Sequence, residues 1–241
     1  SPWWWILFAF GVVEALFTII YYSFLKHIDA TAMNMSWTIE TVFLSTLGII
    51  ILGERWSVAQ GIGVACVIGG VVYLAFGQKH MPTAKTLLIL VVMAALVTPA
   101  DFTQKLALDY GASFWAVLFW FMFGHSVGSI TIPLTIPTAR KQVQHYLTHK
   151  TRRGFWVILL AEAVVVLFAW MATVKAFELG PISLVTVTAD TSPFFALFFA
   201  WVFSRFLPQA APRELLTAQS VQVKLLSFAV VFTGLVLIAV G

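Results

Sequence analysis

The amino-acid sequence predicts an all-α membrane protein with eight transmembrane helices arranged as two inverted repeats. The prediction rests on three observations: a very apolar composition, eight apolar runs of membrane-spanning length, and an internal similarity between distant helices. Of the 241 residues, 61% are hydrophobic and 10% are charged, whereas soluble domains carry about 25% charged residues. A fold in water could not cover so much apolar surface, so we expect the chain to lie in a lipid bilayer.

Each apolar run contains about 20 residues or more, which is enough for a helix to cross the hydrocarbon core of a bilayer. The runs cover residues 2–25, 31–52, 57–77, 84–108, 113–136, 155–178, 182–205 and 222–241. Most connections are short, but residues 137–154 and 207–221 form longer ones. The formal net charge of +4 comes mostly from basic residues in the connections. Such residues orient a membrane protein, so they do not indicate a nucleic-acid partner.

Residues 53–77 predict a membrane hairpin. The charged pair Glu54 and Arg55 follows one apolar helix, and Ser57 and Gln60 open the next. Glycine in a membrane helix lets a neighbouring backbone come close. The second helix contains four such residues, Gly61, Gly63, Gly69 and Gly70.

The chain also contains an internal similarity. Residues 5–28 align with residues 156–179, and residues 65–77 align with residues 229–241 at a shift of 164. The aligned helices lie five spans apart, an odd number, so the two copies would have opposite orientations. Inverted repeats are typical of secondary transporters. The alternative is a chance similarity between helices that are all rich in Val and Leu.

Three segments together resemble the EamA-type domain of the drug/metabolite transporter superfamily. The Gly-Glu-Arg turn at residues 53–55, followed by Gln60 and a glycine-rich helix, is similar to the hairpin of that domain. Residues 98–105, TPADFTQK, resemble its first-helix segment, and Pro193 resembles the proline of its fourth helix.

The resemblance implies two halves of five helices each. Residues 1–77 would then be the last three helices of the first repeat, and residues 84–241 would be a complete second repeat. The first two helices of the family would be missing, so we expect about 50–60 further residues before Ser1. If the chain is complete instead, we expect a homodimer that covers the gap.

The function that the resemblance implies is transport of small organic metabolites, by efflux or uptake, across the plasma (inner) membrane. Alternating access around a midplane site is the expected mechanism. The alternative is a truncated relative that does not transport and serves as a membrane subunit or receptor. The chain contains one cysteine, Cys66, and no cluster of His and Cys residues or known catalytic motif. We therefore expect no metal, no cofactor and no enzymatic activity.

Acidic side chains within the predicted spans are the candidate site residues. A charge at the centre of a membrane helix costs about 2.5–3.5 kcal/mol, so it needs a partner or a wet cavity. Glu14 shares a helix face with Tyr21, and Glu162 lies at nearly the matching place of the aligned helix. We expect Glu14 and Glu162 to form a central site for proton coupling or for a cationic group. Alternatively, each carboxyl group only holds a neighbouring helix.

Further candidates lie in the predicted spans 31–52 and 182–205. Asp190 shares a polar stripe with Thr186 and precedes Pro193 by three residues, and we expect it to bind a proton or substrate. Thr38 and Glu40 lie on different faces of one helix, so only one of them can face a cavity. Trp170 could stack on an aromatic or cationic ligand, although tryptophan in a membrane helix is more often interfacial.

Two local patterns carry more specific expectations. Asp101 and Lys105 are four residues apart and are expected to neutralise each other as an ion pair. His125 lies between Gly124 and Gly128, whose spacing predicts close packing against another helix. This histidine is expected to be packed and hydrogen-bonded, and a proton relay is the alternative.

Overall fold

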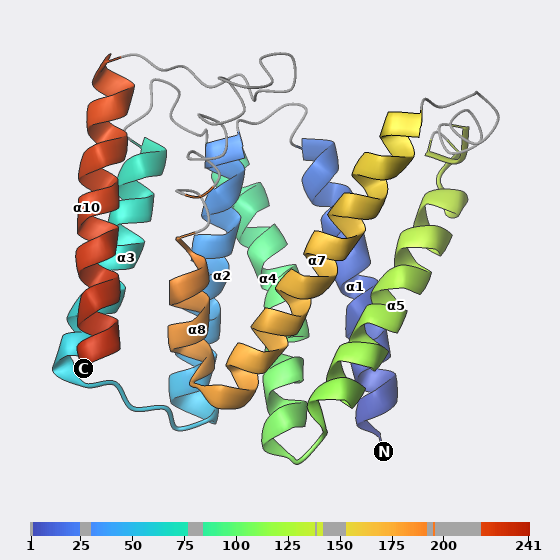
Figure 1. Cartoon of the computed structure of the whole chain (residues 1–241), viewed down its shortest axis with the longest axis horizontal. Helices are drawn as coiled ribbons and strands as arrows, with labels where there is room; N and C mark the ends of the chain where they lie inside the picture. The colour runs from blue at the N-terminus through green and yellow to red at the C-terminus, as the bar shows by residue number, and fades with distance from the viewer. Residues whose placement is uncertain are drawn as a thin grey trace. The chain divides into compact units, whose positions relative to one another are not determined.

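The structure of the chain is a computed structural model. It describes residues 2–24, 30–76, 84–137, 139–141, 153–191, 195 and 218–241. Within these residues every regular element is a helix, as the sequence predicted (Figure 1). The main helices are α1 (Trp3–Phe24), α2 (Ala30–Ile51), α3 (Val58–Phe76), α4 (Ala84–Asp109), α5 (Phe114–Thr135), α7 (Arg153–Leu179), α8 (Ile182–Ala189) and α10 (Ala218–Val240).

Four helices in the described part of the chain are long and apolar enough to cross a membrane. They cover Trp3–Phe24, Lys85–Asp109, Phe114–Thr135 and Leu159–Leu179. Three shorter helical stretches are also apolar, at Trp37–Ile51, Val58–Tyr73 and Leu225–Ile238. The chain therefore has the helices of a membrane protein, and the larger number of eight spans stays a prediction.

Some predicted features lie outside the described residues. The expected span 182–205 is described as a helix over α8 and at Phe195, whereas Pro193 and most of its second half are not described. The same holds for most of the two long connections, residues 137–154 and 207–221.

The helices form two compact units. The first contains residues 1–22 and 99–180, and the second contains residues 23–98 and 181–241. Each unit takes helices from both halves of the sequence, so the units differ from the repeats 1–77 and 84–241. The division within α4 falls at Pro99, which has no N–H group to donate to the helical ladder.

In the first unit, α1 and α5 pack backbone to backbone. A Cβ atom placed on Gly11 would lie 2.2 Å from the carbonyl oxygen of Phe121. A Cβ atom on Gly124 would lie 2.1 Å from the carbonyl oxygen of Phe8, and Gly128 also meets α1 closely. The close packing that the spacing of Gly124 and Gly128 predicted is confirmed. It requires glycine because a side chain would collide with the main chain.

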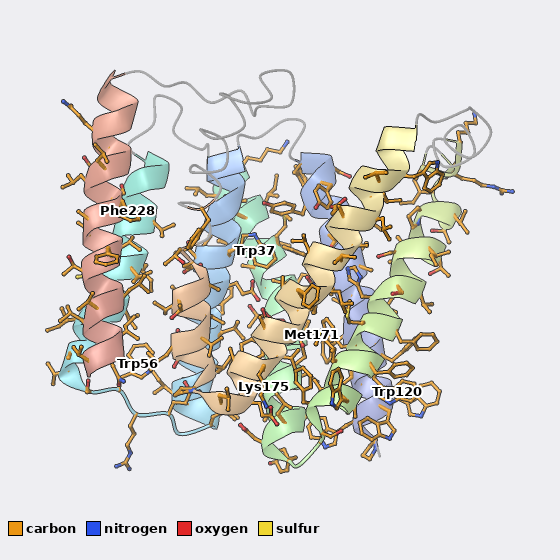
Figure 2. The ribbon with its side chains drawn as sticks, viewed as in Figure 1. Trp37, Trp56, Trp120, Met171, Lys175 and Phe228 are labelled. Atoms are coloured by element: carbon orange, nitrogen blue, oxygen red, sulfur yellow. The ribbon has the colours of Figure 1, made fainter. Side chains whose placement is uncertain are left out.

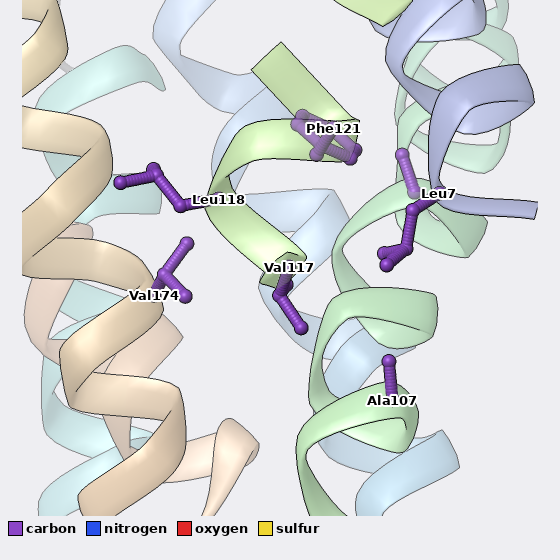
Figure 3. Packing of buried hydrophobic residues seen from close by; sticks show 7 residues of the cluster. Leu7, Ala107, Val117, Leu118, Phe121 and Val174 are labelled. Atoms are coloured by element: carbon purple, nitrogen blue, oxygen red, sulfur yellow. The ribbon is translucent and has the colours of Figure 1, made fainter. Parts of the chain in front are cut away.

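Apolar side chains from α1, α4, α5 and α7 fill the interior of this unit (Figure 3). Its buried members are Leu7, Ala100, Ala107, Val117, Leu118, Phe121 and Val174. Aromatic rings extend the packing at the start of α1, where Trp3 stacks on Tyr110 and Trp4 stacks on Trp120. This packing fixes the position of α1 against the C-terminal part of α4 and against α5.

In the second unit, α3 and α10 run antiparallel (Figure 1) and touch through small residues. A Cβ atom on Gly63 would lie 2.6 Å from the carbonyl oxygen of Gly234, and a Cβ atom on Gly234 would lie 2.6 Å from that of Gly63. Further along α3, a Cβ atom on Gly70 would lie 3.2 Å from the carbonyl oxygen of Ser227. The contact point advances along α3 while it recedes along α10, which establishes the antiparallel direction.

The glycines of α3 have two different roles. Gly63 and Gly70 allow the approach of α10, as expected. A Cβ atom placed on Gly61 or Gly69 would meet nothing within 4 Å in the described part of the chain. The start of α3 is fixed by a capping box: Gln60 N–H donates to Ser57 Oγ at 3.1 Å, and Ser57 N–H donates to Gln60 Oε1 at 2.9 Å.

We predict that Gly63→Ala destabilises the protein by about 1–3 kcal/mol, because the added methyl group overpacks the backbone of α10. Gly69→Ala is the matched control, since its methyl group enters open space. It should leave the stability unchanged or raise it by up to about 1 kcal/mol through helix propensity. Thermal unfolding of the detergent-solubilised chain measures both. Equal stability of the two variants would contradict this description of the α3–α10 contact.

Candidate functional site: buried carboxyl groups

Glu14 is a buried acidic residue in the middle of α1. Its exposed fraction is 5%, and its Oε2 atom has no hydrogen-bond partner among the described residues. The glycine contacts between α1 and α5 hold this part of α1 inside the first unit. The neighbouring acidic residue is Asp101 on α4, close enough for the two carboxyl groups to interact electrostatically.

Gln104 is hydrogen-bonded to one of these two carboxyl groups, that of Asp101. Its Nε2 atom donates a hydrogen bond to Asp101 Oδ1 at 2.9 Å. The Gln104 side chain is 1% exposed, and its Oε1 atom has no hydrogen-bond partner in the described part of the chain. Glu14, Asp101 and Gln104 therefore form a group of oxygen acceptors, which we call the carboxyl cluster. Glu14 and Gln104 are buried in it, and Asp101 is half-buried.

The expected ion pair between Asp101 and Lys105 is not the one that forms. Lys105 Nζ instead lies 3.0 Å from Asp109 Oδ1. It also donates to the carbonyl oxygens of Phe177 and Gly180, at 2.9 and 3.1 Å. The last carbonyl groups of a helix lack internal partners and carry partial negative charge, so a lysine at the end of α7 is favourable. As a result, the described residues give neither Glu14 nor Asp101 an ion-pair partner.

Glu162 lies on a different surface. Its side chain is exposed in the N-terminal half of α7 and interacts electrostatically with the hydroxyl group of Tyr22. The structure thus associates Glu14 with Asp101, and Glu162 with the end of α1. Periodicity along one helix could not distinguish these arrangements, because it does not say which helix covers a given face.

The aromatic candidates of the first unit pack within the protein. Trp170 is half-buried, with its ring centre 4.8 Å from that of Phe121 and 5.8 Å from that of His125. Tyr21 is half-buried too, and its ring centre lies 5.9 Å from that of Phe17. These rings line the interior beside α1 and α5.

Asp190 is the buried acidic residue at the end of α8. It is 4% exposed and accepts a hydrogen bond from the hydroxyl group of Thr41 on α2. The two helices pack side by side within the second unit (Figure 1). Thr38 and Glu40 are also buried, with exposed fractions of 4% and 3%. Both faces of α2 are therefore covered by protein, including the one that carries Glu40.

Glu54 has a role that the sequence analysis did not identify. Its carboxylate accepts hydrogen bonds from the backbone N–H groups of Ile182 and Ser183, at 2.7 and 3.3 Å, and from the Ser183 hydroxyl group. The same hydroxyl oxygen accepts a hydrogen bond from Trp56 Nε1 at 2.9 Å (Figure 2). Glu54 and Trp56 thus hold the N-terminus of α8.

The sequence before α8 explains why the start of this helix needs acceptors from another part of the chain. Pro181 occupies the N-cap position and has no side-chain acceptor for the first N–H groups of the helix. A carboxylate is favoured there, because a helix N-terminus carries partial positive charge. Gly48 makes room for it, since a Cβ atom at Gly48 would lie 2.6 Å from Glu54 Oε2. The missing cap at Pro181 was the signal that could have identified this contact.

Comparison of the sequence with protein-family models and with curated proteins gives no match. Within the residues that the structure describes, no three His, Cys, Asp or Glu side chains gather closely enough to hold a metal ion. The chemistry open to the carboxyl cluster is therefore that of its acceptor oxygens: accepting hydrogen bonds, binding a proton, or attracting a positively charged group.

We predict that Glu54→Ala weakens the anchoring of α8. The loss should be about 1–3 kcal/mol, because charged hydrogen bonds to N–H groups at a helix start are removed. Hydrogen exchange at the backbone amides of Ile182 and Ser183 measures it directly, and both should lose protection. Arg55→Ala is the control, since Arg55 is an exposed neighbour in the same turn. Unchanged protection in Glu54→Ala would contradict the capping role.

Proposed function

We propose that this chain is an α-helical secondary transporter that moves a small organic metabolite across a plasma-type (inner) membrane by alternating access. The carboxyl cluster is the observation that carries the proposal. It places two acidic side chains together inside apolar helices, and the described residues provide no basic partner for either. Charged groups in this setting are costly, so those that persist usually serve ion or substrate pathways.

The chemistry of such a cluster suits coupled transport. Removal from water favours the protonated form of a carboxyl group, and a nearby cation favours the ionised form. A proton and a cationic group would therefore compete for the same oxygens. Alternating occupancy by proton and substrate is the basis on which a proton gradient can drive substrate movement.

The antiparallel contact between α3 and α10 is compatible with the proposed inverted repeat. The shift of 164 residues converts the contact of Gly63 with Gly234 into that of Ser227 with Gly70, which is also present. It likewise converts the Val67 contact at Gly234 into the Val231 contact at Gly70. Any two antiparallel helices in contact have this reciprocal pattern, and an axis in the membrane plane that relates two inverted copies is one arrangement that produces it.

A second function is favoured by the surface of α7. From Trp156 to Ala169 every side chain that the structure describes is exposed, and most are apolar. Such a surface also suits a membrane subunit or receptor that contacts another membrane protein. The alternative is therefore a membrane subunit or receptor that does not transport, and a transport assay separates the two.

We predict that the reconstituted chain takes up at least one compound from a panel of labelled amines, amino acids, carboxylic acids and nucleosides in liposomes with an imposed pH gradient. Glu14→Gln and Asp101→Asn should each reduce the gradient-driven uptake to the level of empty liposomes, because the charge that couples proton and substrate is lost. Exchange of substrate without a gradient should persist in at least one of them.

The matched control is Glu178→Gln, which removes an acid that is paired with Lys175 at the exposed end of α7 (Figure 2). It should retain uptake. Glu162→Gln tests the pairing of Glu14 with Glu162 that the internal repeat predicts. If the two residues form one site, this variant should lose proton coupling as well. A folded wild-type chain that moves nothing in the panel would favour the subunit or receptor alternative, and normal coupling in both cluster variants would remove the cluster from the mechanism.

A further inference from the structure

We propose that the carboxyl cluster of Glu14, Asp101 and Gln104 binds the ammonium group of a primary amine. This inference deepens the proposed transport function, because it names the class of substrate at the same site. Binding can nevertheless be measured without transport, so the two proposals can fail separately.

The carboxyl cluster contains acceptor atoms that no described residue uses. Glu14 Oε2 and Gln104 Oε1 are both without a hydrogen-bond partner in the described part of the chain, although both side chains are at least nine-tenths buried. Buried polar atoms in proteins nearly always have a partner. Gln104 Oε1 is an acceptor, and so is Glu14 Oε2 when its carboxyl group is ionised, so the partner of each has to supply an N–H or O–H donor.

The orientation of the Gln104 amide group shows which of its two ends is free. Its Nε2 atom is bound to Asp101 Oδ1, which assigns Oε1 as the free end of the same amide group. The free amide oxygen therefore lies on a side chain that is bound to the Asp101 carboxyl group. Three side chains from two helices, α1 and α4, contribute acceptors to the carboxyl cluster.

The two carboxyl groups of the cluster have no basic partner among the described residues. Lys105 is the basic residue next to Asp101 on α4, but Asp109 and the carbonyl oxygens at the end of α7 already bind its ammonium group. The described ion pairs are those of Lys105 with Asp109 and of Lys175 with Glu178. A positively charged ligand would supply what the cluster lacks, and charge-assisted hydrogen bonds are the stronger ones.

The candidate cations differ in the number of hydrogen-bond donors that they carry and in the number of oxygen ligands that they need. A proton shared by the two carboxyl groups would supply one donor and would leave Gln104 Oε1 unused. A calcium-like ion requires about six to eight oxygen ligands, more than this cluster of three side chains provides. A primary ammonium group carries three donors, one for each of Glu14, Asp101 and Gln104. A quaternary ammonium group has the charge but no donor.

Calorimetric titration of the full chain in detergent with n-butylammonium chloride tests the proposal. We expect saturable binding that tetramethylammonium and sodium at equal concentration do not reproduce. Glu14→Gln and Asp101→Asn should each weaken binding by about 30-fold or more, as expected for the loss of one member of a buried charged pair. Gln104→Leu should weaken it too, because one acceptor is removed, and Glu178→Gln should bind as the wild type does.

Three results would overturn the proposal: equal affinity for tetramethylammonium, binding that the cluster variants do not change, or no binding of butylammonium to folded protein. If Glu14→Gln fails to fold, the remaining two cluster variants decide the question. Butylammonium binding without uptake of any compound would reject transport and retain the amine site. Coupled uptake of a compound without an amino group, with no butylammonium binding, would do the reverse.

Discussion

A carboxylate inside a membrane has neither water nor headgroups around it, so its protein neighbours decide what it can bind. In the first unit, Lys105 is taken by Asp109 and by the end of α7. Glu14 and Asp101 are left beside each other without an ionic partner among the described residues. The tight glycine contacts between α1 and α5 keep Glu14 buried, so solvent cannot replace the missing cation. The site proposed here depends on that arrangement.

Two other charged side chains complete helix termini, which separates them from the carboxyl cluster. Lys105 binds carbonyl groups at the C-terminus of α7, and Glu54 binds N–H groups at the N-terminus of α8. Both charges have the sign that the helix dipole favours at that end. Asp190 accepts a hydrogen bond from Thr41, and its Oδ2 atom, like Glu14 Oε2, has no hydrogen-bond partner among the described residues. Charges that complete a helix terminus contribute to stability, whereas acceptors without a donor are candidates for ligand binding.

Local sequence patterns predicted the local features well. The helical class followed from composition, the start of α3 from Ser57 and Gln60, and the close approach of α5 from Gly124 and Gly128. Partners across helices could not be predicted in the same way. The spacing of Asp101 and Lys105 permits an ion pair, but the carbonyl groups of α7 and the carboxylate of Asp109 bind the lysine instead. Likewise, which glycines of α3 face another helix depends on the position of α10, not on α3 itself.

The most direct test observes the two carboxyl groups themselves. Isotope-edited NMR of the carboxyl carbons, with resonances assigned by Glu14→Gln and Asp101→Asn, follows both groups in the full chain in lipid nanodiscs. If they form one site without an ionic partner, both resonances move together when butylammonium is added, and substitution of either residue changes the response of the other. The account would be contradicted if neither resonance shifts when butylammonium is added and each responds to pH independently of the other.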